Sequence, residues 1–284
     1  MLWWQALLLG LLQGATELFP VSSLGHAVLL PHLLGWHYNQ SDPAFVPYVV
    51  LLHLGTAGAL LFYFRDEWVR LARGFFVAVY RGRVEGPDQH LAMMLLVGTI
   101  PAGLAGVFFE SELKRLFASP RVAAAFLVVN GAIMAGGELL RRADEQRRHL
   151  APAAAEAAYA SEERVRLPAA LAVGASQALA LLPGISRSGV TMTTSLAVGL
   201  RHEAAARFSF LLATPVILAA GLLEVPSLAS AGPSAGIYLA GAVLAGIAAY
   251  LSTRFLLRYF ESGRLGPFAV YCVALGVLGL LLVH

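Results

Sequence analysis

The chain has 284 residues, of which 58% are hydrophobic and 13% are charged, and its mean hydropathy is +0.70. A soluble domain carries about 25% charged residues, so this chain cannot cover a water-facing surface and is expected to be an integral membrane protein. Its net charge of +3 does not indicate nucleic-acid binding, because the arginines flank hydrophobic segments and act as topology signals. Cys272 is the single cysteine, which excludes an intrachain disulfide.

The first apolar segment, residues 5–35, is broken at its centre by a proline and several polar side chains. Pro20 ends the first helical arm, because proline removes a backbone donor and clashes with the preceding turn. Ser22 or Ser23 can cap the second arm, on which Ser23 and His26 share a face. Each arm is shorter than the ~20 residues that cross a bilayer. The segment is therefore predicted to be a re-entrant hairpin with a polar elbow, surrounded by protein or a water-filled cavity.

Hydrophobic runs and charged connectors divide the rest of the chain. A charged, alanine-rich segment at residues 146–167 is interpreted as a cytoplasmic linker between two halves, 1–145 and 168–284. The predicted segments of the first half are the hairpin 5–35 and the spans 48–64, 91–109 and 122–140. Those of the second half are the hairpin 168–200 and the spans 207–223, 236–256 and 266–283.

The two halves resemble each other in sequence. Residues 17–25 align with residues 180–189 when one insertion is allowed, and residues 98–117 align with residues 241–260. Each half has one hairpin and three spans, and an odd number of crossings places the halves in opposite orientations. The predicted fold class is an all-α polytopic membrane protein of two inverted-topology repeats, each a re-entrant helical hairpin plus three transmembrane helices.

The distribution of basic residues predicts how these segments are oriented. Most arginines fall on one side of the predicted spans, whereas Lys114, Arg115 and Arg121 fall on the other. The arginine-rich connections are residues 65–90, 141–167, 201–206 and 254–264. By the positive-inside rule that side is cytoplasmic and both termini face outward. The two hairpins then enter from opposite sides, so their elbows can meet near the midplane.

Glu17 and Arg187 are the deepest charges, one in each elbow. A lone charge at the centre of a membrane segment costs at least ~2.5–3.5 kcal/mol, so both are candidates for function. One interpretation is a buried ion pair that holds the hairpins together, although such pairs stabilise weakly. The other is an anion site, in which Arg187 binds an anion while Glu17 works beside it.

The residues around Arg187 favour the anion site. Ser186, Ser188, Gly189 and Thr191 lie at the start of a predicted helix, where free N–H groups and the helix dipole attract phosphate. Arginine supplies forked donors that match phosphate oxygens. Alternatively, the serines are only helix caps and the threonine bonds within its own helix.

The remaining polar residues allow two interpretations each. His26 is either a packed histidine or a catalytic one, since it lies one turn from Ser23 in the hairpin that contains Glu17. His53, within a predicted span, is interpreted as interfacial or structural. Gln13 and Glu17 share a helix face and offer an amide and a carboxylate. This is a sparse ligand set for Mg²⁺, which can nevertheless be held by one carboxylate with substrate phosphates and water.

Two motifs stand at the elbows. Gln-x-x-x-Glu followed by Phe-Pro-Val-Ser-Ser-x-Gly-His covers residues 13–26, and Pro-Gly-x-Ser-Arg-Ser-Gly-x-Thr covers residues 183–191. Together they resemble the motifs of the bacterial undecaprenyl-diphosphatase (bacitracin-resistance) family, and the span layout is similar over essentially the whole chain. The resemblance implies hydrolysis of undecaprenyl diphosphate to the monophosphate lipid carrier, stimulated by Mg²⁺ or Ca²⁺. It also implies a homodimer in the bacterial cell membrane, with a site that opens to the outer face.

The resemblance assigns roles by position. The catalytic residues are expected at Glu17, Ser23, His26 and Arg187. The substrate phosphate is expected at Ser22, Ser186, Arg187, Ser188, Gly189 and Thr191, and a divalent cation at Glu17 and Gln13. Many members of the family carry Glu where this chain has Gln13, which argues against a two-carboxylate metal clamp here.

The expected mechanism leaves the nucleophile open. It is either Ser23, which would form a phosphoserine, or a water molecule. His26 is the expected general base, because the pKa of histidine lies near working pH. Glu17 would orient His26 or hold the cation, while Arg187 and the following helix start would bind the transferred phosphoryl group.

Three other kinds of protein were weighed. A transporter or flippase for a polyprenyl phosphate explains an inverted repeat with midplane charges equally well, but it predicts binding without phosphate release. A membrane phosphatase of the acid-phosphatase type needs a histidine six residues after the arginine, where this chain has Thr193. A purely structural membrane protein leaves the polar elbows unexplained.

Overall fold

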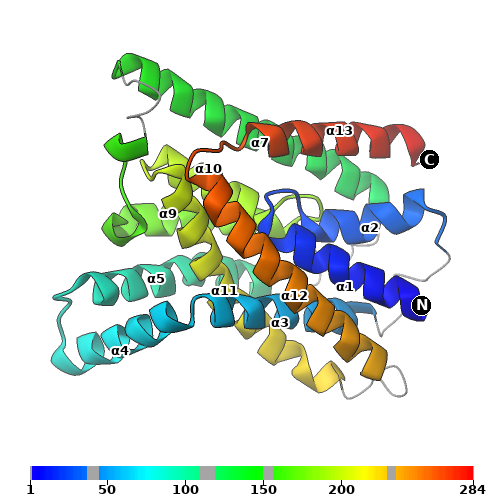
Figure 1. Ribbon diagram of the computed structural model, residues 1–284, viewed down its shortest axis with the longest axis horizontal. Helices are drawn as coiled ribbons and strands as arrows, with labels where there is room; N and C mark the ends of the chain where they lie inside the picture. Colours follow the sequence, from blue (N-terminus) through cyan, green and yellow to red (C-terminus); the bar gives the residue numbers. More distant parts are fainter. Residues whose placement is uncertain (1, 37–44, 109–118, 150–155, 229–234, 284) are drawn as a thin grey trace.

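The structure, a computed structural model, describes residues 2–36, 45–108, 119–149, 156–228 and 235–283 (Figure 1). Over these ranges the chain forms α-helices and short 3-10 helices without a β-strand, apart from an isolated bridge between Ala160 and Leu200. The predicted all-α class is confirmed. The predicted outer loop with Lys114 and Arg115 lies outside the described residues.

The first hairpin consists of α1 (Trp3–Leu18) and α2 (Ser23–Leu33). Phe19 is extended, with φ −63° and ψ 140°, because the residue before a proline disfavours the helical region. Ser22 has a φ of +67° and caps α2, its hydroxyl accepting a hydrogen bond from the N–H of Gly25. The predicted break at the elbow is confirmed, and Ser22 is the serine that caps the second arm.

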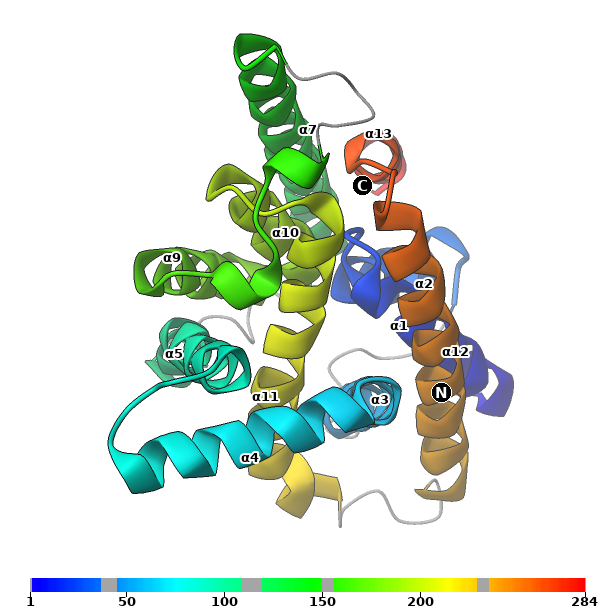
Figure 2. The same ribbon diagram turned by 60° about the vertical axis from the view of Figure 1, so that its left-hand side comes forward.

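A sharp bend follows the hairpin. α3 (Phe45–Tyr63) meets α4 (Arg65–Arg81) at an angle of 84°. In Figure 2 α3 is seen nearly end-on, while α4 runs across the view. α4 contains most of the arginine-rich connector that the sequence predicted. The first half is completed by α5 (Pro87–Phe108) and α7 (Pro120–Arg147).

α7 is longer than the predicted span, which ended at residue 140. Ion pairs one helical turn apart extend it: Arg141 Nε lies 3.3 Å from Glu145 Oε1, and Arg148 Nε lies 2.9 Å from Asp144 Oδ2. The hydrophilic composition of this stretch therefore marks a helix end outside the apolar region rather than an irregular connection.

The second half repeats the order of elements. Its helices are η1 (Glu156–Ala158), η2 (Glu162–Arg164), α9 (Leu167–Gln177), η3 (Ala178–Leu181), α10 (Arg187–Ala197), α11 (His202–Leu228), α12 (Ala235–Phe260) and α13 (Gly266–Leu282). The second elbow lies between η3 and α10. Gly184 in this elbow has a φ of +101° and lies so close to α7 that a side chain there would overlap the carbonyl of Ala123.

Several helices are suited to cross a membrane. Four are long and apolar enough, namely α5, α7, α12 and residues 202–221 of α11, and the bent pair α3–α4 meets the same criteria when taken together. α13 and the α9–η3 segment are shorter apolar helices. The chain is therefore a multi-pass membrane protein. The start of α1 and the end of α13 lie at one end of the molecule, and the α4–α5 connection and the end of α7 lie at the other (Figure 1).

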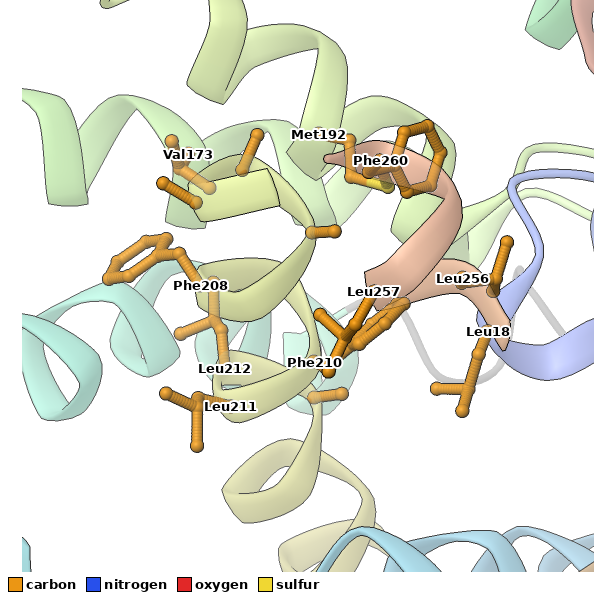
Figure 3. Close-up of a cluster of buried hydrophobic side chains, with 14 of the residues drawn as sticks. Leu18, Val173, Met192, Phe208, Phe210, Leu211, Leu212, Leu256, Leu257 and Phe260 are labelled. Atoms are coloured by element: carbon orange, nitrogen blue, oxygen red, sulfur yellow. The ribbon is translucent and has the colours of Figure 1, made fainter. Parts of the chain in front are cut away.

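The hydrophobic core lies beside the elbows. Figure 3 shows the meeting point of five helices, with Leu18 from α1, Val173 from α9, Met192 from α10, Phe208 from α11 and Phe260 from α12. All five side chains are fully buried. The core thereby joins the last turn of α1, which carries Glu17, to the helix that follows the second elbow.

Candidate active site

The two elbows contact each other directly. Ser188, at the start of α10, donates a hydrogen bond to the carbonyl of Phe19 in the first elbow (3.0 Å). Asn130 of α7 bonds to both elbows: its amide donates to the carbonyl of Pro20 (3.1 Å), and its Oδ1 accepts from the N–H of Ser186 (3.0 Å). The sequence analysis did not include Asn130, although a buried amide in an otherwise apolar span is itself a marker of function or structure.

Glu17 and Arg187 form the centre of the site. Arg187 Nη2 donates to Glu17 Oε1 at 2.8 Å, and the carboxylate side chain is only 6% exposed. The other oxygen, Oε2, accepts from Ser23 Oγ at 2.6 Å and from Gln13 Nε2 at 2.8 Å. The predicted meeting of Glu17, Ser23 and Arg187 from the two halves of the chain is therefore present in the structure.

Arg187 retains an unused donor. Its Nη1 is buried and has no hydrogen-bond partner among the described residues. A buried N–H without a partner costs about 1–3 kcal/mol, more when charged, so such a group indicates a ligand or solvent that completes it. A phosphate oxygen matches this donor, because guanidinium groups bind phosphate through parallel N–H bonds.

The serines and threonine around Arg187 are partly occupied within the protein. Ser186 caps α10 by accepting from the N–H of Gly189 (3.2 Å) and lies 3.0 Å from the hydroxyl of Ser188. Thr191 donates to the carbonyl of Arg187 within its own helix (2.7 Å) and lies 2.6 Å from the hydroxyl of Ser209. The alternative of capping and back-bonding therefore describes Ser186 and Thr191, and their predicted contacts with a substrate phosphate stay predictions.

His26 lies in the same hairpin but points to a different partner. Its Nδ1 donates to the carbonyl of Ser22 (2.7 Å), and its Nε2 accepts from the hydroxyl of Tyr271 on α13 (2.8 Å). The ring is 1% exposed and stacks on that of Tyr271. Both ring nitrogens are thus engaged away from Glu17, so the structure does not show the predicted pairing of these two residues.

His53 of α3 is instead the histidine beside Glu17. Its Nε2 lies 3.4 Å from Glu17 Oε2, and its Nδ1 donates to the carbonyl of Val49 (2.8 Å). The sequence analysis interpreted His53 as interfacial or structural. Its position near Glu17 depends on how α3 packs against α1, which the local sequence does not reveal.

The expected cation site can be compared with these contacts. Glu17 Oε1 faces Arg187, and Oε2 accepts from Ser23 and Gln13, whose amide N–H is turned to the carboxylate. Among the described residues there is no cluster of three or more His, Cys, Asp or Glu side chains that could hold a metal ion. Gln13 and Glu17 therefore do not fit a resident metal clamp, because donors rather than a cation satisfy the carboxylate.

A second charged cluster lies far along α7 from the elbows. Glu138 accepts from Arg264 Nη1 (2.8 Å) and pairs with His202 Nε2 (3.1 Å), while His202 Nδ1 pairs with Glu156 (2.7 Å). Burial alone would raise the pKa of Glu156, but the hydrogen bonds from His202 outweigh it and hold that pKa below its usual value. This cluster joins α7, η1, α11 and the α12–α13 connection.

The fold and the site together define a multi-pass membrane protein with a buried arginine–glutamate–serine centre between two helical elbows. The chain belongs to the family of the bacitracin resistance protein BacA, which matches residues 6–278.

Similar proteins include three whose names agree. Undecaprenyl-diphosphatase 2 of Chromobacterium violaceum is 47% identical over 283 residues, which cover 98% of this chain and 97% of that protein. Undecaprenyl-diphosphatase 2 of Burkholderia lata is 48% identical over 284 residues, covering 99% and 98%. Undecaprenyl-diphosphatase 1 of Burkholderia pseudomallei is 47% identical over 284 residues, covering 99% and 98%.

Proposed function

We propose that this protein is a membrane phosphatase that hydrolyses undecaprenyl diphosphate to undecaprenyl phosphate and inorganic phosphate. This reaction recycles the lipid carrier for cell-wall synthesis and, since bacitracin sequesters the diphosphate, gives bacitracin resistance. The names of the relatives support the activity. The observation that carries it is the site itself: Arg187 has a buried, unpartnered N–H beside a carboxylate that accepts the hydroxyl proton of Ser23.

The geometry favours Ser23 as nucleophile and Glu17 as its base. Ser23 Oγ would attack the terminal phosphorus while its proton moves to Glu17 Oε2, 2.6 Å away. The bond between phosphorus and the bridging oxygen breaks, and undecaprenyl phosphate leaves with the bonding electrons. Water then attacks the phosphoserine, releasing phosphate and returning the proton to Ser23. Arg187 balances the charge on the transferring group in both steps.

A divalent cation stays a prediction from the resemblance. Because the contacts of Glu17 leave no clamp for a resident ion, we expect Mg²⁺ or Ca²⁺ to arrive with the diphosphate oxygens of the substrate. Bound there, it would neutralise part of the negative charge on the leaving phosphate.

Two inverted repeats remain the architecture that we propose. Two equivalent contacts support them: a methyl group on Gly10 would overlap the carbonyl of Gly241, and one on Gly174 would overlap the carbonyl of Gly98. Each contact joins the first hairpin helix of one half to the middle span of the other, and Gly98 and Gly241 begin the stretches aligned in the sequence. We therefore propose re-entrant hairpins that enter from opposite faces.

The orientation follows from the same plan. The arginine-rich α4 and the end of α7 lie opposite the chain ends in Figure 1, so we propose outward-facing termini and a site that opens to the outer face. We also expect a homodimer, which the mass of the detergent-solubilised protein would test.

The deciding experiment separates a phosphatase from a polyprenyl-phosphate flippase. Purified protein in proteoliposomes should release inorganic phosphate from undecaprenyl diphosphate, and Arg187→Ala should not. A flippase would bind or move the lipid without releasing phosphate, so saturable lipid binding with no phosphate release by wild type would refute the proposed function.

A further inference from the structure

His53 brings a third element, α3, to the carboxylate of Glu17. Gln13 reaches it from α1 itself, Ser23 from α2 and Arg187 from α10. The imidazole is held by its own helix, because Nδ1 donates to the carbonyl of Val49 one turn earlier (2.8 Å). This bond points Nε2 at Glu17 Oε2, 3.4 Å away.

The two oxygens of Glu17 have separate tasks in the proposed reaction. Oε1 accepts from Arg187 Nη2, whereas Oε2 faces Ser23. A competing arrangement is available, because a guanidinium and a carboxylate prefer to form two parallel hydrogen bonds. Rotation of the carboxylate would bring Oε2 to the unpartnered Nη1 of Arg187. That arrangement would remove the base from Ser23 and consume the donor that phosphate needs.

The contact of His53 opposes this rotation. Gln13 and Ser23 are neutral donors to Oε2, and the charged groups that face His53 are Glu17 from α1 and Arg187 from α10. The ring lies next to Oε2, so the carboxylate would lose this contact if it turned to form a bidentate pair with Arg187. The side chain of His53 is 26% exposed and that of Glu17 only 6%, so the ring also covers the carboxylate from the more open side.

We propose that His53 is a positioning residue of the active site, which holds Glu17 so that one oxygen serves Ser23 and the other serves Arg187. This inference rests on the proposed phosphatase function. It gives α3, which contributes none of the motif residues, a defined part in the reaction.

The test compares two substitutions that differ in one property. His53→Gln keeps a side-chain N–H that can reach Glu17, whereas His53→Leu removes it at similar bulk. His32→Leu is the control, because His32 is an exposed histidine on α2. Initial rates of phosphate release give kcat and KM for undecaprenyl diphosphate, and melting temperatures in detergent show whether each variant is folded.

We expect His53→Leu to lower kcat about 10–100-fold, the size of effect that a misplaced catalytic group produces. KM should rise as well, because Nη1 is then occupied by the carboxylate. His53→Gln should recover most of the loss, and His32→Leu should match wild type. If His53→Leu is not recovered folded, His53→Met takes its place as the apolar variant.

Two results would overturn the inference. One is a wild-type kcat in a folded apolar variant. The other is an equal loss in His53→Gln and His53→Leu, since rescue by the retained N–H is what distinguishes positioning from a structural role. Wild-type protein without phosphate release would instead refute the proposed function, and the activity of the His32→Leu control makes the two failures distinguishable.

Discussion

Arg187 carries two loads at the residue scale. One N–H group holds the base, and the other has no protein partner and is left for the substrate. This division needs a planar fork with several donors, which lysine lacks because its charge is concentrated on one flexible ammonium. The identity of the cation, and not only its charge, should therefore determine the rate.

We expect Arg187→Lys to lower kcat/KM for undecaprenyl diphosphate by roughly 100-fold, the effect of losing one donor aimed at the developing charge. Phosphate release by the purified protein measures it. Arg254→Lys is the matched control, because Arg254 is exposed on α12 and should retain full activity. Activity of Arg187→Lys within threefold of wild type would show that a positive charge alone is sufficient.

At the scale of elements, α7 fixes the distance between the elbows through a single amide. Asn130 is fully buried and satisfies one carbonyl in the first elbow and one N–H in the second. Backbone groups in an elbow have no helical partner, so a buried elbow needs such a donor and acceptor from elsewhere.

Asn130→Leu should therefore lower both stability and activity. Two buried backbone groups lose their partner, at about 1–3 kcal/mol each, and the elbows are free to separate. The melting temperature in detergent and phosphate release test this expectation. Val129→Leu, on the exposed side of the same helix, should change neither. An unchanged melting temperature for Asn130→Leu would contradict this account of the elbows.

Close helix contacts supply a second prediction at this scale. Gly174 of α9 touches the backbone of Gly98 in α5, whereas Gly103 of α5 has open space where a side chain would be. Gly174→Ala should destabilise by about 1–3 kcal/mol through overpacking. Gly103→Ala should be neutral or stabilising, because alanine favours a helix interior over glycine by roughly 0.5–1 kcal/mol. Thermal unfolding of the two variants compares them directly, and equal melting temperatures would refute the close contact.

Across the whole molecule, the cluster of Glu138, Glu156, His202 and Arg264 joins segments from both halves. The pKa of Glu156 is lowered in the folded state, so its ionised form stabilises the fold. That contribution is fully present above the usual glutamate value of about 4.3 and is lost as the pH falls through the folded value.

Wild type should thus lose thermal stability as the pH falls from about 5 towards 3, in the window set by the usual glutamate pKa. Glu156→Gln should be less stable at neutral pH and should lose less on acidification. Melting temperatures across this range measure both. A parallel decline of the two proteins would show that Glu156 does not contribute to the acid sensitivity.

The sequence predicts the elbows well because their causes are local. Pro20 and Ser22 break and restart the helix within a few residues, and the meeting of Glu17 with Arg187 follows from the repeat. Partners chosen by packing were not predictable. His26 bonds to Tyr271, which is 245 residues away, while the Glu17 contact falls to His53. In both cases the polar residue was visible, but its neighbour depended on which helix faces meet.

The division of the centre between two hairpins has a consequence for damaged chains. A polypeptide that stops after α7 would contain Glu17 and Ser23 but not Arg187, and one that starts at η1 would contain the reverse. Neither fragment holds the complete machinery, so premature termination anywhere before the second elbow yields an inert product rather than a weakened one.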